Sequence, residues 1–184
     1  MNQQFVDNKY LCVPGFISTQ EADDFAQWMY LQEQLGLLVK DSRENLNLFG
    51  MASLNGLPFI KLLVKKIPEI SDICGEDVLP TYTYAIIYKH NSELIRHTDR
   101  PACEISVTIN LQKDVDWPVC VKTLNGEEVC IELNPGDALV YKGCEIEHWR
   151  SGKFNGQNFI QVFLHYVNAN GNSADLFFDR KKTQ

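Results

Sequence analysis

Residues 97–111 read HTDRPACEISVTINL, in which a His-x-Asp triplet is followed within a few residues by an alternating run. From residue 104 to 111, polar Ser106, Thr108 and Asn110 alternate with apolar, mostly β-branched residues. Alternation with a period of two is typical of a strand, because successive side chains point to opposite faces. The polar face of this strand either faces water or lines a cavity.

Short apolar or β-branched runs of this kind fill the chain from residue 80 onward. Asn125-Gly126 is a strong hairpin signal, and the Asn-Pro-Gly-Asp sequence at 134–137 is a second turn. Short strands at this spacing predict a sandwich or a small barrel. The predicted strands are residues 82–88, 104–111, 118–122, 128–133, 138–141, 145–149 and 158–167.

The first third of the chain has a helical pattern instead. A short strand at 9–13 precedes Ser18 and Glu21, which fit a capping box. We expect the helix that begins there to end near Gly36, and a second helix to cover 58–67 and stop before a proline. Helices in this position would pack on one sheet of the β region. The predicted fold class is therefore α+β, mainly β.

Length and composition limit the classes of protein that the chain can belong to. The 184 residues suit one domain, with a helical N-terminal part (about 1–79), a β core (about 80–167) and a C-terminal tail (168–184). Hydrophobic residues make up 45% of the chain, which is typical of a globular protein. A formal net charge of −7 disfavours general binding to a nucleic-acid backbone. Without a signal segment or a run of membrane-spanning length, the expected location is cytoplasmic, away from membranes.

The six cysteines form no Cys-x-x-Cys pair, which argues against a thiolate zinc site. Because no secretion signal is present, we expect reduced and mostly buried thiols. The cysteines are Cys12, Cys74, Cys103, Cys120, Cys130 and Cys144.

Three residues with metal-ligating side chains fall at the ends of predicted strands. On an extended segment His97 and Asp99 point the same way, so they present an imidazole and a carboxylate to one point. His148 follows 49 positions after Asp99, at the far end of the β region. Two imidazoles and one carboxylate on one face leave three positions of an octahedral metal open, as in non-haem Fe(II) oxygenases. The pattern indicates a metal site at His97, Asp99 and His148.

The order of these motifs resembles the Fe(II)/2-oxoglutarate dioxygenases, most closely the prolyl-hydroxylase-like branch. Tyr88 precedes His97 with eight residues between them, and VTINL at 107–111, NPGDALVY at 134–141 and EHWR at 147–150 follow in the family's order. The resemblance spans about residues 80–167. It implies a double-stranded β-helix (jelly-roll) core with N-terminal helices packed on one sheet, and iron held by the triad near one mouth.

In that family a basic residue nine or ten positions after the second histidine usually binds the distal carboxylate of 2-oxoglutarate. Those positions are Gln157 and Asn158 here, and neither is charged. Arg150 is the leading substitute, because it lies two residues after His148 and on a continuing strand faces the same interior. An exposed Arg150 in a loop is the alternative, and Lys122 on an earlier strand is a weaker candidate.

Further residues receive roles from the resemblance. Tyr88 matches a tyrosine that hydrogen-bonds the co-substrate in that family, and a core aromatic at a strand end is the alternative. By strand period, Asn110 and Gln161 either line the same pocket or face water. Arg100 follows the triad aspartate and would lie at the pocket mouth, where it either binds substrate or supports Asp99. His165, late on the last strand, is expected to be structural.

The resemblance implies an Fe(II)- and 2-oxoglutarate-dependent dioxygenase that hydroxylates a C–H bond of a peptide or small molecule. O₂ and 2-oxoglutarate would be its co-substrates, with ascorbate as a candidate reductant for reactivation. The alternatives are a jelly-roll metalloenzyme that does not use 2-oxoglutarate and a non-catalytic metal-binding module. Residues 39–56 are either a lid or an ordinary connection, and the oligomeric state stays open.

Overall fold

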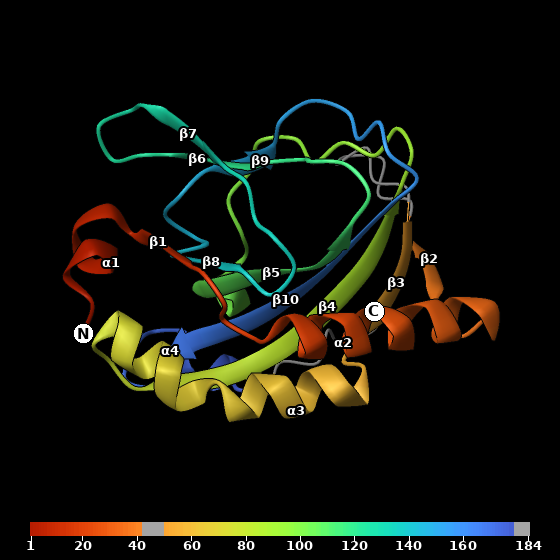
Figure 1. The fold of residues 1–184 in the computed structure, drawn as a ribbon. Coiled ribbons are helices and arrows are strands. Elements are labelled where there is room, and N and C mark those ends of the chain that lie inside the picture. Colours follow the sequence, from red (N-terminus) through yellow and green to blue (C-terminus); the bar gives the residue numbers. More distant parts are fainter. Residues whose placement is uncertain (42–49, 179–184) are drawn as a thin grey trace.

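The computed structural model describes residues 1–41 and 50–178, which form two antiparallel sheets that face each other and a layer of helices (Figure 1). The strands of the large sheet are β1 (Tyr10–Val13), β2 (Val39–Asp41), β3 (Gly50–Leu54), β4 (Val78–Lys89), β5 (Ile105–Lys113), β8 (Ala138–Tyr141) and β10 (Asn158–Asn168). Their order is β1-β8-β5-β10-β4-β3-β2. The small sheet has the order β7-β6-β9, and its strands are β6 (Val119–Lys122), β7 (Glu128–Ile131) and β9 (His148–Arg150).

The large sheet has a helix-covered face and a face inside the barrel, and strand alternation assigns each residue to one of them. On β5, Val107 and Ile109 belong to the core beneath the helices, where Val162 of β10 joins them. Val121 of β6 packs against Leu139 from the other side. The polar face of β5 therefore lines the interior between the two sheets. The predicted jelly-roll core with helices on one sheet is confirmed.

Helices α2 (Thr19–Gln34), α3 (Leu57–Lys65) and α4 (Ile67–Cys74) cover the outer face of the large sheet, and α1 (Gln3–Asn8) lies at one end beside β1 (Figure 1). Short 3₁₀ turns occur at Pro101–Cys103 and Ala174–Leu176. The capping box of α2 is confirmed, because Ser18 Oγ accepts from the Glu21 amide and the Glu21 carboxylate accepts from the Ser18 amide, both at 3.1 Å.

Two helical features differ from the sequence prediction. The second predicted helix does stop before Pro68, because α3 ends at Lys65, but a further helix, α4, was not predicted. Pro68 lies in the first turn of α4, where a missing amide hydrogen costs no bond. Helix α1 was not predicted, since its polar sequence has no apolar stripe. Asn2 caps it by accepting from the Phe5 amide, and Phe5 is its one buried side chain.

Residues 39–56, expected to be a lid or a connection, contribute two strands at the edge of the large sheet. Val39–Asp41 pairs with Gly50–Leu54, and Gly50–Leu54 pairs with β4. Residues 42–49 of this segment lie outside the described residues. The N-terminal part of the chain thus supplies β1, β2 and β3 in addition to the helices.

The expectation that all six cysteines are reduced is wrong for one pair. Cys120 and Cys130 form a disulfide across β6 and β7, where they are directly opposed with their Cα atoms 4.0 Å apart. The register explains this, because a hairpin centred near Asn125-Gly126 places residues five positions before and after its centre opposite each other. Of the free thiols, Cys74 and Cys103 are buried and Cys144 is exposed.

Within residues 1–41 and 50–178, none of the helices combines the length and the apolar character that crossing a membrane requires.

Candidate metal centre

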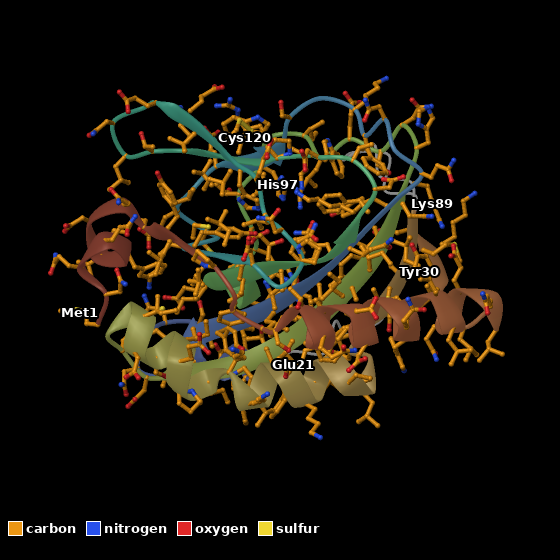
Figure 2. The ribbon with its side chains drawn as sticks, in the orientation of Figure 1. Met1, Glu21, Tyr30, Lys89, His97 and Cys120 are labelled. Atoms are coloured by element: carbon orange, nitrogen blue, oxygen red, sulfur yellow. A yellow bond between two sulfur atoms is a disulfide. The ribbon has the colours of Figure 1, made fainter. Side chains whose placement is uncertain are left out.

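The two histidines of the predicted triad are held side by side by their backbones. The amide of His97 donates to the carbonyl of His148 at 3.1 Å, and the amide of His148 donates back at 2.9 Å. This isolated bridge fixes the two imidazole rings with their centroids 4.3 Å apart. Figure 2 shows His97 between the two sheets, beneath the small sheet that carries His148 on β9.

Each imidazole has one nitrogen engaged and the other directed at the site. Nδ1 of His97 lies 2.8 Å from the carbonyl oxygen of Ile95, and Nδ1 of His148 lies 3.0 Å from that of Ile146. A carbonyl oxygen only accepts, so both Nδ1 atoms carry the hydrogen and both Nε2 atoms keep a free lone pair. Burial lowers the pKa of His148, which favours the neutral ring that a metal requires.

Asp99 completes the group with one oxygen. Its Oδ1 lies 3.9 Å from Nε2 of His97 and 3.7 Å from Nε2 of His148, and the three ligand atoms all lie within 4.8 Å of one another. The second oxygen, Oδ2, accepts a 2.8 Å hydrogen bond from Ser106 Oγ. The Asp99 amide donates to the carbonyl of Gly143 at 2.8 Å. The donor set fits a divalent metal with open coordination positions.

Asp99 also belongs to a second group of potential ligands, with Cys103 and His165. Burial raises the pKa of the Cys103 thiol to about 12, so at neutral pH this sulfur is protonated and a poor ligand. The first group fits a metal better, because its three members line an open pocket.

Aromatic side chains form most of the pocket wall around the triad. Tyr82, Tyr84 and Tyr88 come from β4, and Phe163 comes from the neighbouring strand β10. Tyr88 is buried and packs edge-on against Trp117, with 5.2 Å between ring centroids. The remaining lining residues are Leu94, His97, Asp99, Tyr141, His148 and His165.

Arg150 is buried inside the barrel, with 4% of its surface exposed, as its spacing from His148 predicted. Its guanidinium donates to the Trp117 carbonyl and to Oε1 of Gln161, and it stands 4.6 Å from the centroid of the Phe159 ring. Burial lowers the pKa of Arg150 to about 10, so it stays charged at neutral pH. Among the described residues, no carboxylate forms an ion pair with it.

Two buried amides lie on neighbouring strands near this arginine. Gln161 of β10 is paired in register with Asn110 of β5, and its side-chain oxygen is an acceptor for Arg150. Asn110 is fully buried, and neither of its side-chain atoms has a hydrogen-bond partner within the described part of the chain. A buried amide without a partner is costly, which indicates a place for a polar ligand or water.

The other candidates for binding a distal carboxylate point elsewhere. Lys122 is 45% exposed and forms a 3.3 Å ion pair with Glu147. Gln157 is exposed, and Asn158 accepts a hydrogen bond from Lys89. The structure therefore leaves Arg150 as the candidate inside the barrel.

Arg100, expected at the pocket mouth, lies against one residue of the pocket wall. Its side chain is exposed, and its guanidinium stands 4.7 Å from the centroid of the Tyr82 ring, which lines the pocket.

Three residues that contact Asp99 or its neighbours were not predicted to belong to the site. Ser106 was singled out only for its strand face, and His165 was expected to be structural, yet both lie directly behind the Asp99 carboxylate. No sequence pattern marks Gly143, although a Cβ at this position would lie 2.5 Å from Asp99 Oδ2. The alternation of polar and apolar residues along β5 placed Ser106 on a face that either meets water or lines a cavity. The positions of His165 and Gly143 next to Asp99 follow only from the three-dimensional structure.

No protein-family model matches this sequence, and no curated protein matches it either. Solved structures do match. One is a prolyl-4-hydroxylase from Pseudomonas putida, with a TM-score of 0.74, 12% identity, and coverage of 90% of this chain and 96% of that one. Another is the epimerase SnoN in complex with Fe³⁺, α-ketoglutarate and nogalamycin RO, with a TM-score of 0.77, 11% identity, and coverage of 99% and 89%.

A third is a prolyl hydroxylase from Trichoplax adhaerens in complex with a hypoxia-inducible-factor peptide fragment. It gives a TM-score of 0.71 at 14% identity, with coverage of 90% of this chain and 86% of that one. At these identities the likeness defines the fold. The chain has the double-stranded β-helix fold of the Fe(II)/2-oxoglutarate-dependent dioxygenases, including its prolyl-hydroxylase-like members.

Proposed function

We propose that this protein is an Fe(II)- and 2-oxoglutarate-dependent dioxygenase that hydroxylates a C–H bond of a peptide or small molecule. The observation that carries the proposal is the pairing of two features in one barrel. His97, Asp99 and His148 form an open metal-binding group, and Arg150 is a buried cation without a carboxylate partner among the described residues.

The triad residues would hold the iron through two imidazole nitrogens and one carboxylate oxygen. Backbone hydrogen bonds already fix both histidine tautomers with Nε2 free, so no proton must move before the metal binds. Bound Fe(II) with 2-oxoglutarate supplies the oxidising chemistry, in which O₂ is consumed and 2-oxoglutarate is converted to succinate and CO₂.

Arg150 would receive the distal carboxylate of 2-oxoglutarate. A charged guanidinium in a buried site needs an anion, and a carboxylate is the anion whose geometry it matches. Gln161 accepts a hydrogen bond from Arg150, Asn110 lies opposite Gln161 in the sheet register, and Tyr88 interacts electrostatically with the guanidinium. We assign these three side chains to the same carboxylate pocket. Aromatic walls around the pocket keep water away from the reacting groups.

The substrate would enter beside Arg100, which stacks over Tyr82 at the pocket edge. Solved structures with this fold hold a peptide in one case and nogalamycin RO in another. These occupants support a peptide or a small molecule as the class of substrate for this chain.

Substitution of a ligand tests the metal site. We expect His97→Ala and Asp99→Ala to abolish Fe(II) binding, measured by equilibrium dialysis, and succinate formation from 2-oxoglutarate, measured by chromatography. His90→Ala, in an exposed turn outside the pocket, is the matched control and should retain both. Succinate production at the wild-type rate by Asp99→Ala would contradict the assignment.

A metalloenzyme that does not use 2-oxoglutarate is the second candidate. It is favoured by Gln157 and Asn158, which stand where the family usually has its basic residue and which lie away from the pocket. Iron binding without any effect of 2-oxoglutarate on the bound metal would support this candidate.

A further inference from the structure

A short chain of buried hydrogen bonds starts at Oδ2 of Asp99, the oxygen that is farther from the two histidines. Ser106 Oγ is 2.8 Å from Asp99 Oδ2 and 3.0 Å from Nδ1 of His165. Ser106 is fully buried, and 5% of His165 is exposed. None of the comparisons and none of the sequence patterns assigns a role to this arrangement.

The chemistry of the partners sets the direction of each hydrogen bond. Asp99 Oδ2 and the carbonyl oxygen of Cys103, 3.2 Å from Ser106 Oγ, are acceptors only, so the single hydroxyl hydrogen goes to one of them. The carboxylate is the closer of the two and carries the charge. His165 Nδ1 must then be the donor to the serine oxygen, and the Tyr141 hydroxyl also faces that oxygen.

The fold places His165 in this position through an irregularity in the large sheet. His165 is paired with Ser106 across β10 and β5. On the other side of β10, the pairing with β4 is irregular. Leu164 pairs with Thr83 and Tyr166 pairs with Pro80, so the single residue His165 lies opposite two residues of β4. Such bulges re-aim side chains next to active sites. The Tyr82 ring packs on the imidazole with 4.5 Å between centroids, which fixes the ring plane.

We propose that Ser106 and His165 are positioning residues that hold the Asp99 carboxylate so that Oδ1 alone faces the metal. This inference rests on the proposed function, because it concerns the same metal site. Oδ1 is the oxygen nearest both histidines, while Oδ2 is occupied by the serine hydroxyl. A carboxylate that binds through one oxygen leaves a further coordination position for co-substrate and O₂.

Loss of either group should release the Asp99 carboxylate from this orientation. Without the Ser106 hydroxyl, Oδ2 has no partner on that side, and the carboxylate is free to rotate toward the metal with both oxygens. Without the N–H donor of His165, the Ser106 oxygen loses the hydrogen bond that keeps its own hydrogen pointing at Asp99. Partners of metal ligands typically contribute about 10- to 100-fold to metal affinity.

The test uses Co²⁺ as the probe, because its visible absorption reports coordination number without any turnover. Wild type, Ser106→Ala, His165→Asn and His165→Leu are titrated with Co²⁺ and their spectra recorded. Asn keeps an N–H donor near the Nδ1 position, whereas Leu has a similar shape and no donor. Both lose the stacking on Tyr82, so the difference between them isolates the hydrogen bond.

We expect Ser106→Ala to bind Co²⁺ about 10- to 100-fold more weakly and with an altered visible spectrum. His165→Leu should bind at least about fivefold more weakly than His165→Asn, which should keep the wild-type spectrum. If circular dichroism shows that Ser106→Ala does not fold, the comparison of the two His165 variants decides.

Two results overturn the inference in different ways. Wild-type affinity and spectrum in Ser106→Ala, or identical behaviour of His165→Asn and His165→Leu, overturns the positioning role and leaves the proposed metal site standing. A wild-type protein that binds no Co²⁺ overturns the metal site, and the positioning role is refuted with it.

Discussion

Arg150 is the buried cation to which the proposed function assigns the co-substrate. Arg150 has two neutral hydrogen-bond acceptors and two aromatic neighbours, and no carboxylate ion pair within the part of the chain that the structure describes. A buried charge in such surroundings is unfavourable until an anion binds. The guanidinium is therefore better explained by the ligand than by the stability of the fold.

Replacement of Arg150 by Met removes this charge and keeps the length of the side chain. We expect the KM for 2-oxoglutarate to rise about 10- to 100-fold, since a charge-assisted hydrogen bond contributes about 1.5–3 kcal/mol. Fe(II) affinity should stay unchanged, because Arg150 does not touch the triad. Lys122→Met is the control, since that lysine is exposed and paired with Glu147, and it should leave KM unaltered. An unchanged KM in Arg150→Met would assign the co-substrate to another residue.

Buried His165 predicts how stability depends on pH. Its pKa is lowered by burial from 6.5 to about 4, so between these values the unfolded chain binds a proton that the folded chain does not. The free energy of unfolding should therefore fall as pH drops below 6.5, by about 1.4 kcal/mol per pH unit from this group, until pH approaches 4. Urea titrations at about pH 7 and about pH 5 measure the effect. His165→Leu should remove it, and an equal pH dependence in the variant would refute this origin.

At the scale of elements, the connection between β8 and β9 lies directly against the metal site. Gly143 accepts a hydrogen bond from the Asp99 amide, and a Cβ at Gly143 would also clash with the Cys103 carbonyl. The backbone approaches the Asp99 carboxylate this closely because the residue has no side chain.

We expect Gly143→Ala to weaken Fe(II) binding by at least about tenfold, because the added methyl group displaces Asp99. Equilibrium dialysis with Fe(II) measures the loss. Gly126→Ala is the control, since Gly126 has a φ of +84° and an added Cβ there would meet no atom within 4 Å. It should cost about 1 kcal/mol of stability without changing metal affinity. Equal metal affinity in the two alanine variants would show that the loop does not constrain the site.

The disulfide between β6 and β7 stabilises the hairpin next to β9, the strand that carries His148 and Arg150. Cys120 and Cys130 are ten positions apart, and a loop of this length should contribute about 3 kcal/mol to the free energy of unfolding. Urea unfolding of Cys120→Ala/Cys130→Ala should show this loss, whereas Cys144→Ala, at an exposed free thiol, should not. A double variant as stable as wild type would contradict the expected contribution.

Over the whole molecule, the sequence predicts those features that depend on a local pattern of residues. It does not predict individual hydrogen bonds between residues that are far apart in the chain. Strand alternation predicted a sandwich or small barrel, and the family resemblance implied the jelly roll. The spacing along the strands indicated that His97, Asp99 and His148 meet at one point. The hydrogen bond of His165 could not be predicted from a local pattern, because its partner Ser106 lies 59 residues earlier in the chain. The absence of a secretion signal predicts reduced thiols, whereas the hairpin register places Cys120 opposite Cys130, and the structure has the disulfide.

The central claim is that one barrel holds Fe(II) at the triad and 2-oxoglutarate between that metal and Arg150. The direct measurement is anaerobic addition of Fe(II) and then 2-oxoglutarate, followed by visible absorption spectroscopy. We predict that one equivalent of Fe(II) binds and that 2-oxoglutarate then produces a metal-to-ligand charge-transfer band, which is absent in Asp99→Ala. Iron binding without a band, or no iron binding at all, would contradict the claim.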